Sequence, residues 1–118
     1  MEYPYASDPK YAEIDKRAQK ELSTPDVRRG RLRKVLAMKG LVTALEAHSG
    51  LTGLIVENTV VAEKGGARQF DAMWISSLCD STAKGKPDIE LVDMTSRFRT
   101  VDDICEVTTK PILFDGDT

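Results

Sequence analysis

Histidine, cysteine and long apolar runs are scarce in this 118-residue chain. His48 is the single histidine, which excludes a site built from several histidines of this chain. Cys79 and Cys105 are the two cysteines, and they lack CxxC spacing, so we expect a reduced, cytoplasmic protein. No apolar run approaches the roughly 20 residues of a membrane span, and the first residues lack the apolar core of a signal peptide.

The charge of the chain is nearly balanced. Its 17 Lys and Arg residues and 19 Asp and Glu residues give a net charge of −2, with an isoelectric point near 5.4. This balance argues against nucleic acid as the main partner. A basic stretch lacks the interleaved aromatic side chains of a single-strand binder, so we interpret it as the exposed face of an amphipathic helix. Its cations are Arg28, Arg29, Arg31, Arg33 and Lys34.

Residues 1–40 predict a helical extension. Apolar side chains at helical spacing indicate a helix over residues 9–22, for which Asp8 supplies an N-cap. A second helix is expected over residues 26–39, and Gly40 ends it. We therefore treat this segment separately from the rest of the chain.

From residue 41 onward, strand and helix patterns alternate. Apolar runs predict strands at 41–45, 70–75 and 112–114. Helices are expected at 51–63 and, from a capping-box pattern, at 100–107, with a long polar loop at 76–88. Such alternation is typical of βαβ units with a parallel sheet. The expected fold is α/β: the amino-terminal three βα units of a (β/α)₈ TIM barrel, preceded by one or two helices.

A complete barrel of this kind takes about 250 residues. Residues 41–118 are therefore expected to form the first three strands of an incomplete barrel, with the chain as one piece of a longer polypeptide. A three-stranded parallel sheet buried on both faces would make a poor independent domain. We expect that the remainder of the barrel is required for activity.

Polar residues follow each predicted strand, and the carboxyl ends of barrel strands converge on one mouth. These residues are Glu46, His48 and Ser49, then Ser76 and Ser77, then Asp115 and Asp117. Carboxylate oxygens are ligands that Mg²⁺ prefers, which makes Asp115 and Asp117 candidates for a metal site. Taken alone, the Asp115-Gly116-Asp117 segment fits a glycine turn with solvated carboxylates equally well. Three convergent endings favour a site.

Simpler interpretations exist for the other motifs. Ser76 and Ser77 can form a turn beneath a core Trp74, or present hydroxyls and backbone amides to an anion. His48 beside Glu46 is typical of a structural histidine. The segment 84–88 fits a solvated loop tip. Met38 and Met73 are interpreted as core residues.

Four phrases occur in an order and spacing that carry a family resemblance. They are Glu46-Ala47-His48-Ser49-Gly50-Leu51, Trp74-Ile75-Ser76-Ser77-Leu78, Gly85-Lys86-Pro87-Asp88 and Leu113-Phe114-Asp115-Gly116-Asp117-Thr118. Together they resemble the amino-terminal part of the phosphoenolpyruvate mutases, within the isocitrate lyase/phosphoenolpyruvate mutase superfamily. The resemblance covers about residues 28–118, and the Trp-x-Ser-Ser-Leu phrase with the Asp88 loop favours the mutase branch over the methylisocitrate lyases.

The resemblance implies a (β/α)₈ barrel that forms homodimers or homotetramers by helix exchange, with a Mg²⁺-dependent site at its carboxyl mouth. The implied reaction interconverts phosphoenolpyruvate and 3-phosphonopyruvate by moving a phosphoryl group from oxygen to carbon, as in phosphonate biosynthesis. The implied partner is this small-molecule substrate, with no nucleic acid and no membrane. We expect the helix over residues 9–22 to pack outside the barrel, on a neighbouring subunit or on the rest of the protein.

The resemblance also implies residue roles. Asp115 and Asp117 match the acidic pair that holds Mg²⁺, and Asp88 matches an aspartate proposed as nucleophile or as a guide for the migrating phosphoryl group. The residues matching the substrate-binding segment and its aromatic wall are Ser76, Ser77, Leu78 and Trp74. This chain has Ser77 where the family has glycine.

Several family motifs are expected beyond Thr118: a Glu-Asp-Lys lid motif with a downstream Asn-Ser, a later metal-shell glutamate and a phosphate-binding arginine. We therefore expect the 118-residue chain alone to be inactive. Two alternatives to a mutase remain at this point. One is a phosphonopyruvate hydrolase or a 2-methylisocitrate lyase-like enzyme that cleaves C–P or C–C bonds, and the other is a non-catalytic barrel fragment.

Overall fold

Three parallel strands form the centre of the structure, a computed structural model that describes residues 25–117. Their spatial order is β1 (Ala44–Glu46), β4 (Ala72–Ile75) and β5 (Ile112–Phe114). Leu45 pairs with Met73, and Met73 pairs with Ile112. The predicted parallel α/β arrangement is confirmed, whereas closure into a barrel stays a prediction. The helix predicted over residues 9–22 lies outside the described residues.

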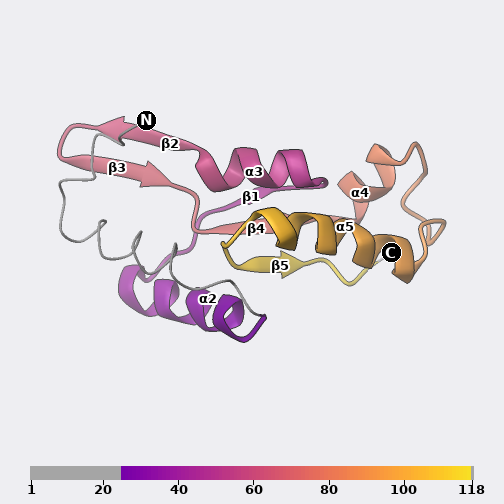
Figure 1. The fold of residues 1–118 in the computed structure, drawn as a ribbon, viewed down its shortest axis with the longest axis horizontal. Helices are drawn as coiled ribbons and strands as arrows, with labels where there is room; N and C mark the ends of the chain where they lie inside the picture. The colour runs from indigo at the N-terminus through magenta and orange to yellow at the C-terminus, as the bar shows by residue number, and fades with distance from the viewer. Residues whose placement is uncertain (1–24, 118) are drawn as a thin grey trace.

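Helices connect and cover this sheet (Figure 1). They are α2 (Pro25–Lys39), α3 (Gly50–Asn58), α4 (Ser77–Ala83) and α5 (Met94–Val107). Figure 1 shows α4 at one end of the molecule and α2 toward the other. No helix among residues 25–117 combines the length and the apolar character needed to cross a membrane.

The core lies between the sheet and the packed helices α3 and α5. Ala47, Val56, Met73, Ile75 and Ile104 are all buried there. Gly53 permits the close approach of α3 to α5, because a Cβ at this position would lie 3.2 Å from Cγ2 of Ile104. The predicted core role is confirmed for Met73 but is wrong for Met38, which is 64% exposed on α2.

Helix α2 has the predicted extent, but one of its cations was misassigned. Arg28 is buried, and its guanidinium donates hydrogen bonds to the backbone oxygens of Cys105 and Thr108 and, at 3.0 Å, of Lys110. The interpretation of the whole basic stretch as an exposed face is therefore wrong at this position. The carboxyl end of α5 leaves carbonyl groups without helical partners, and Arg28 satisfies them.

Two element boundaries also differ from the prediction. The first strand starts at Ala44 instead of residue 41, because pairing with β4 begins where the Thr43 oxygen accepts from the Asp71 amide. The helix predicted over residues 51–63 ends at Asn58, and an antiparallel hairpin of β2 (Val60–Glu63) and β3 (Gly66–Gln69) follows it. Its turn contains Gly65 with φ +97°, a conformation that favours glycine.

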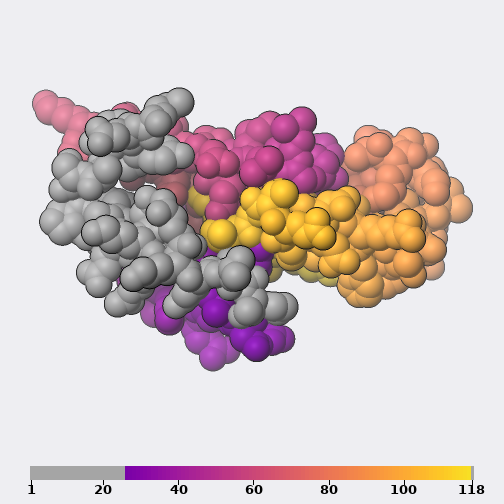
Figure 2. All heavy atoms as spheres, in the orientation of Figure 1, coloured from indigo at the N-terminus to yellow at the C-terminus, as the bar shows by residue number. Residues whose placement is uncertain are grey.

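Residues 76–88 were predicted as a loop, but α4 occupies much of this segment. The last helix begins at Met94 instead of residue 100, because the Asp93 side chain caps it by accepting from the Ser96 amide. Thr100 is consequently inside α5, where it is buried and faces α4. In the space-filling view, α4 and the loop after it form one end of the molecule (Figure 2).

Candidate functional site

The site lies where β4 and β5 end. Because the strands are parallel, their carboxyl ends lie at the same edge of the sheet. The residues that follow each strand in the sequence come together at this edge. The Ser77 amide donates to Oδ2 of Asp115 at 3.2 Å, and the Ser77 hydroxyl contacts the same oxygen at 3.0 Å. These bonds link the first residue of α4 to the residue after β5, across 38 positions of the sequence.

Ser77 also reaches Asp88. Its hydroxyl lies 3.0 Å from Oδ2 of Asp88, the same distance as from Asp115. A hydroxyl carries one hydrogen, so it can donate to only one of these carboxylates at a time. Oδ1 of Asp88 is buried and has no hydrogen-bond partner among residues 25–117. The structure thus places two carboxyl groups around one serine and leaves a buried acceptor atom unsatisfied.

Asp115 is held in its ionised form. The amides of Asp117 and Ser77, the Ser77 hydroxyl and the Arg97 charge together lower the pKa of its carboxyl below the usual 3.8. The Asp117 amide donates to Oδ1 at 3.0 Å, so Oδ1 and Oδ2 are both engaged. Hydrogen bonds to a carboxylate favour its charged form. At neutral pH, Asp115 therefore presents a negative charge at the strand edge.

Three other predicted site residues flank Ser77 in the sequence and differ in their contacts and exposure. Ser76 is the N-cap of α4, and its hydroxyl accepts from the Cys79 amide at 3.2 Å. Trp74 is 40% exposed while its strand neighbours Met73 and Ile75 are buried, so the interpretation of Trp74 as a core residue is wrong. Leu78 is 59% exposed on the first turn of α4. Both apolar side chains are accessible to solvent.

Glu46 is the last residue of β1, and His48 follows two residues later at the same edge of the sheet. Nδ1 of His48 lies 3.1 Å from the Glu46 carboxylate, and the His48 amide donates to Thr52 of α3. Within residues 25–117, no hydrogen bond or ion pair joins this pair to Ser77. The structure therefore gathers Ser77, Asp88 and Asp115 and keeps the β1 pair separate.

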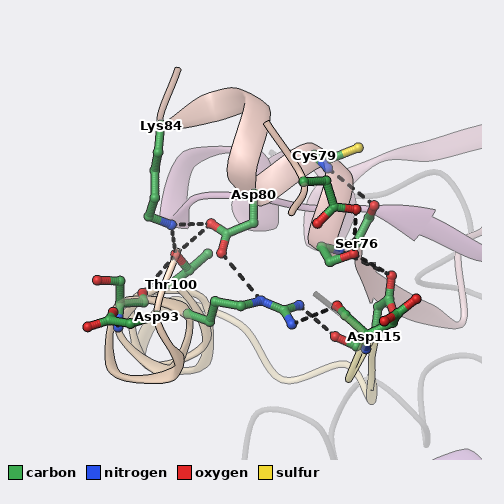
Figure 3. Close-up of polar contacts among 12 residues, drawn as sticks. Ser76, Cys79, Asp80, Lys84, Asp93, Thr100 and Asp115 are labelled. Carbon is green, nitrogen blue, oxygen red and sulfur yellow. Dashed lines mark hydrogen bonds and ion pairs between the residues drawn. The ribbon is translucent and has the colours of Figure 1, made fainter. Parts of the chain in front are cut away.

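A buried ionic network behind the cluster was missed by the sequence analysis (Figure 3). Asp80 of α4 and Arg97 of α5 are each 1% exposed, with Oδ2 and Nε 3.8 Å apart. Lys84 and Thr100 both contact Oδ1 of Asp80. The i,i+4 spacing of Asp80 and Lys84 is a helix signal, but the prediction of a loop concealed it.

The carboxylates suit a hard cation. No group of three or more His, Cys, Asp or Glu side chains within the described part of the chain is arranged to enclose a metal ion. Mg²⁺ commonly takes one or two carboxylates and completes its shell with water and substrate oxygens. Asp115, ionised at the strand edge, and Asp117, two residues later on an exposed turn, fit that pattern.

Known proteins are similar to this chain in sequence and in fold. The sequence profile of the phosphoenolpyruvate phosphomutase family matches residues 32–118. A phosphoenolpyruvate phosphomutase of Streptomyces hygroscopicus is 37% identical over 90 residues, which are 75% of this chain and 26% of the relative. A 2,3-dimethylmalate lyase of Eubacterium barkeri is 28% identical over 89 residues, covering 75% of this chain and 28% of the relative.

A solved structure agrees with the sequence matches. The crystal structure of a phosphoenolpyruvate phosphomutase from Streptomyces platensis subsp. rosaceus superposes with a TM-score of 0.61 at 26% identity, over 73% of this chain and 27% of that one. The chain therefore spans about a quarter of the length of the relatives that it matches. With the family profile matched over most of its residues, the chain belongs to the phosphoenolpyruvate phosphomutase family.

Proposed function

We propose that the intact protein containing this chain is a phosphoenolpyruvate mutase. The reaction breaks the P–O bond of phosphoenolpyruvate and forms a P–C bond, which gives 3-phosphonopyruvate. Family membership supports this activity. The observation that carries the proposal is the convergence of Asp88 and Asp115 on Ser77, since it unites two carboxyl groups and the α4 amino terminus at one strand edge.

Each residue has a distinct role in this proposal. Asp115 and Asp117 hold Mg²⁺, directly or through water, and the bound ion supplies positive charge that stabilises the anionic oxygens of the substrate. The segment Ser76–Leu78 orients the carboxylate and phosphoryl ends, and Trp74 forms an apolar wall. Phosphoryl transfer passes through a loose, charge-spread transition state, so positioning and electrostatics supply most of the catalysis.

Asp88 has a different role from the metal ligands in this proposal. The Ser77 hydroxyl contacts both the Asp88 carboxyl group and that of Asp115, and the buried Oδ1 of Asp88 has no hydrogen-bond partner among residues 25–117. A carboxyl group in this position is available to the migrating phosphoryl group as a nucleophile or as a guide. The proposal also includes the remainder of the barrel, which completes the site, and homo-oligomeric assembly by helix exchange. It places the enzyme in the cytoplasm, in phosphonate biosynthesis.

Two substitutions in the full-length protein test these assignments. Asp88→Asn should lower kcat by at least about 100-fold, the scale of a lost preorganised transition-state contact, with Mg²⁺ affinity nearly unchanged. Asp115→Asn should weaken Mg²⁺ binding first, because it removes a charged ligand. Asp102→Asn, at an exposed position of α5, is the matched control and should alter neither quantity.

Isothermal titration calorimetry with Mg²⁺ and steady-state kinetics with phosphonopyruvate measure the two effects. An equal loss of Mg²⁺ affinity in Asp88→Asn and Asp115→Asn would show that Asp88 belongs to the metal shell. The absence of any phosphoenolpyruvate product from the unmodified protein would refute the mutase activity itself.

A lyase is the second candidate, because a 2,3-dimethylmalate lyase matches the same share of the chain. This class cleaves a C–C bond, and a phosphonopyruvate hydrolase would release pyruvate and phosphate by cleaving a C–P bond. Product analysis by ³¹P NMR separates the two reactions of phosphonopyruvate, and ¹H NMR follows the cleavage of 2,3-dimethylmalate, which contains no phosphorus. Phosphoenolpyruvate formed without free phosphate identifies the mutase, free phosphate identifies the hydrolase, and turnover of 2,3-dimethylmalate alone identifies a lyase.

A further inference from the structure

Arg97 contacts the turn that carries both candidate metal ligands. Its side chain is 1% exposed and extends from the amino-terminal part of α5 to the end of β5. Nη2 donates to the backbone oxygen of Asp115 at 2.6 Å, and Nη1 donates to that of Asp117 at 3.2 Å. One guanidinium therefore holds two carbonyl groups of the same turn, one on each side of Gly116.

The guanidinium is itself fixed on two other sides. Asp80 faces its Nε at 3.8 Å (Figure 3). The guanidinium carbon lies 4.4 Å from the centre of the Phe114 ring. Thr100 donates to Asp80 at 2.9 Å, and Lys84 also contacts the same carboxylate. A buried charge without such partners would be costly, so this arrangement both compensates and orients Arg97.

We propose that Arg97 is a positioning residue that sets the geometry of the Asp115–Asp117 turn and, through Asp80, ties that turn to α4. The inference rests on the proposed function, in which this turn holds Mg²⁺ and the start of α4 holds substrate. Asp80 belongs to the same short helix as Ser77, so one ionic pair joins the metal-binding turn to the substrate-binding segment. Lysine cannot replace the arginine, because an ammonium group lacks the planar fork that reaches two carbonyls at once.

The test compares Arg97→Lys with Thr100→Val in the full-length protein. Arg97→Lys keeps the charge opposite Asp80 but removes the bidentate contact with the turn. Thr100→Val disturbs the same network from the same helix without touching the turn. Hydrogen exchange in the absence of metal reports the turn through the amides of Asp117 and Ser77, which both donate to the Asp115 carboxylate.

Arg97→Lys should accelerate exchange of these amides relative to the amides of β4, and Thr100→Val should not. Mg²⁺ titration should then show a dissociation constant raised roughly 10- to 100-fold in Arg97→Lys, the usual effect of losing a partner that orients a metal ligand. Asp80→Asn provides a second variant. It retains the donors of Arg97, so it should accelerate exchange of the turn to a smaller extent.

A purely structural role for Arg97 predicts a different result. The inference would be overturned if amide exchange rose equally in the turn and in β4. It would also be overturned if the exchange rates of the turn stayed unchanged in both Arg97→Lys and Asp80→Asn. Failure of the proposed function is recognised separately. An unmodified protein that binds no Mg²⁺ would refute the metal role of Asp115, whereas the exchange comparison would still decide whether Arg97 sets the turn.

Discussion

Substitution of a helical glycine by alanine can be compared at Gly53, which packs closely in α3, and at Gly30, which lies in an open position of α2. In Gly53→Ala, the new Cβ would lie 3.2 Å from Cγ2 of Ile104 and 3.2 Å from Cγ2 of Thr108. Carbon atoms favour separations of about 3.5–4.0 Å, so these side chains of α5 must move by a few tenths of an ångström. Gly30 lies within α2, where an added Cβ would meet no other described part of the chain within 4 Å beyond its neighbours and its own helix backbone.

The two effects of Gly53→Ala oppose each other. Replacing glycine by alanine inside a helix stabilises a protein by roughly 0.5–1 kcal/mol, whereas overpacking a core costs about 1–3 kcal/mol. Ile104 is fully buried, so it has little space into which to move. We expect the overpacking to dominate and to lower the free energy of unfolding by about 1 kcal/mol. Gly30→Ala should instead raise it by about 0.5–1 kcal/mol.

Urea unfolding of the full-length protein, followed by circular dichroism, measures both changes. The expected outcome is a midpoint that falls for Gly53→Ala and rises for Gly30→Ala, with unchanged slopes. Two variants that are stabilised to the same extent would refute the close packing of α3 against α5. The difference between the variants is more informative than either value, because the helix-propensity gain is common to both.

Two further predictions concern the supports of the sheet. Arg28→Lys should lower the free energy of unfolding by about 2–3 kcal/mol in urea titrations, because a lysine cannot satisfy several carbonyl groups at and after the end of α5. The control Arg29→Lys, at an exposed position of the same helix, should change this free energy little. Burial opposes ionisation of Asp71, yet its bonds with Lys39 and Thr43 hold its pKa below 3.8. The ionised Asp71 carboxylate therefore stabilises the fold above pH 3.8, and this stabilisation is lost as the pH falls through the lower folded-state pKa. Unfolding curves measured at a series of pH values should show the difference in stability between the unmodified protein and Asp71→Asn shrinking as the pH falls through this range.

Local patterns in the sequence predicted the parts of the fold that local physics determines. Apolar runs separated by helical stretches indicated parallel strands, and the third of them matches β5 at both ends. Parallel strands place their carboxyl ends at one edge, so the approach of Ser77 to Asp115 followed from topology without any side-chain detail. The sequence also carries signals for the hairpin, namely the paired valines at residues 60–61 and the glycines at residues 65–66.

The buried arginines could not be identified in this way. Arg28 and Arg97 bind backbone oxygens that lie at least 18 residues away in the sequence. Every residue supplies a carbonyl group, so nothing in the sequence marks which carbonyls will receive a guanidinium. The sequence pattern predicts that Arg28 is exposed, like its basic neighbours on α2. Arg28 differs from them only because α2 packs against the end of α5 and buries its side chain.

Finding a helix at residues 77–83 also changes the interpretation of Asp88. A flexible loop would deliver this carboxyl group to the site only when the loop closed. Instead, α4 ends in a turn in which the Lys86 amide donates to Ser81 at 2.9 Å, and the chain returns so that Asp88 contacts the Ser77 hydroxyl at the opposite end of the same helix. Asp88 is therefore held in place by the short helix that precedes it. A preorganised carboxyl group suits the proposed phosphoryl transfer, in which positioning supplies most of the rate.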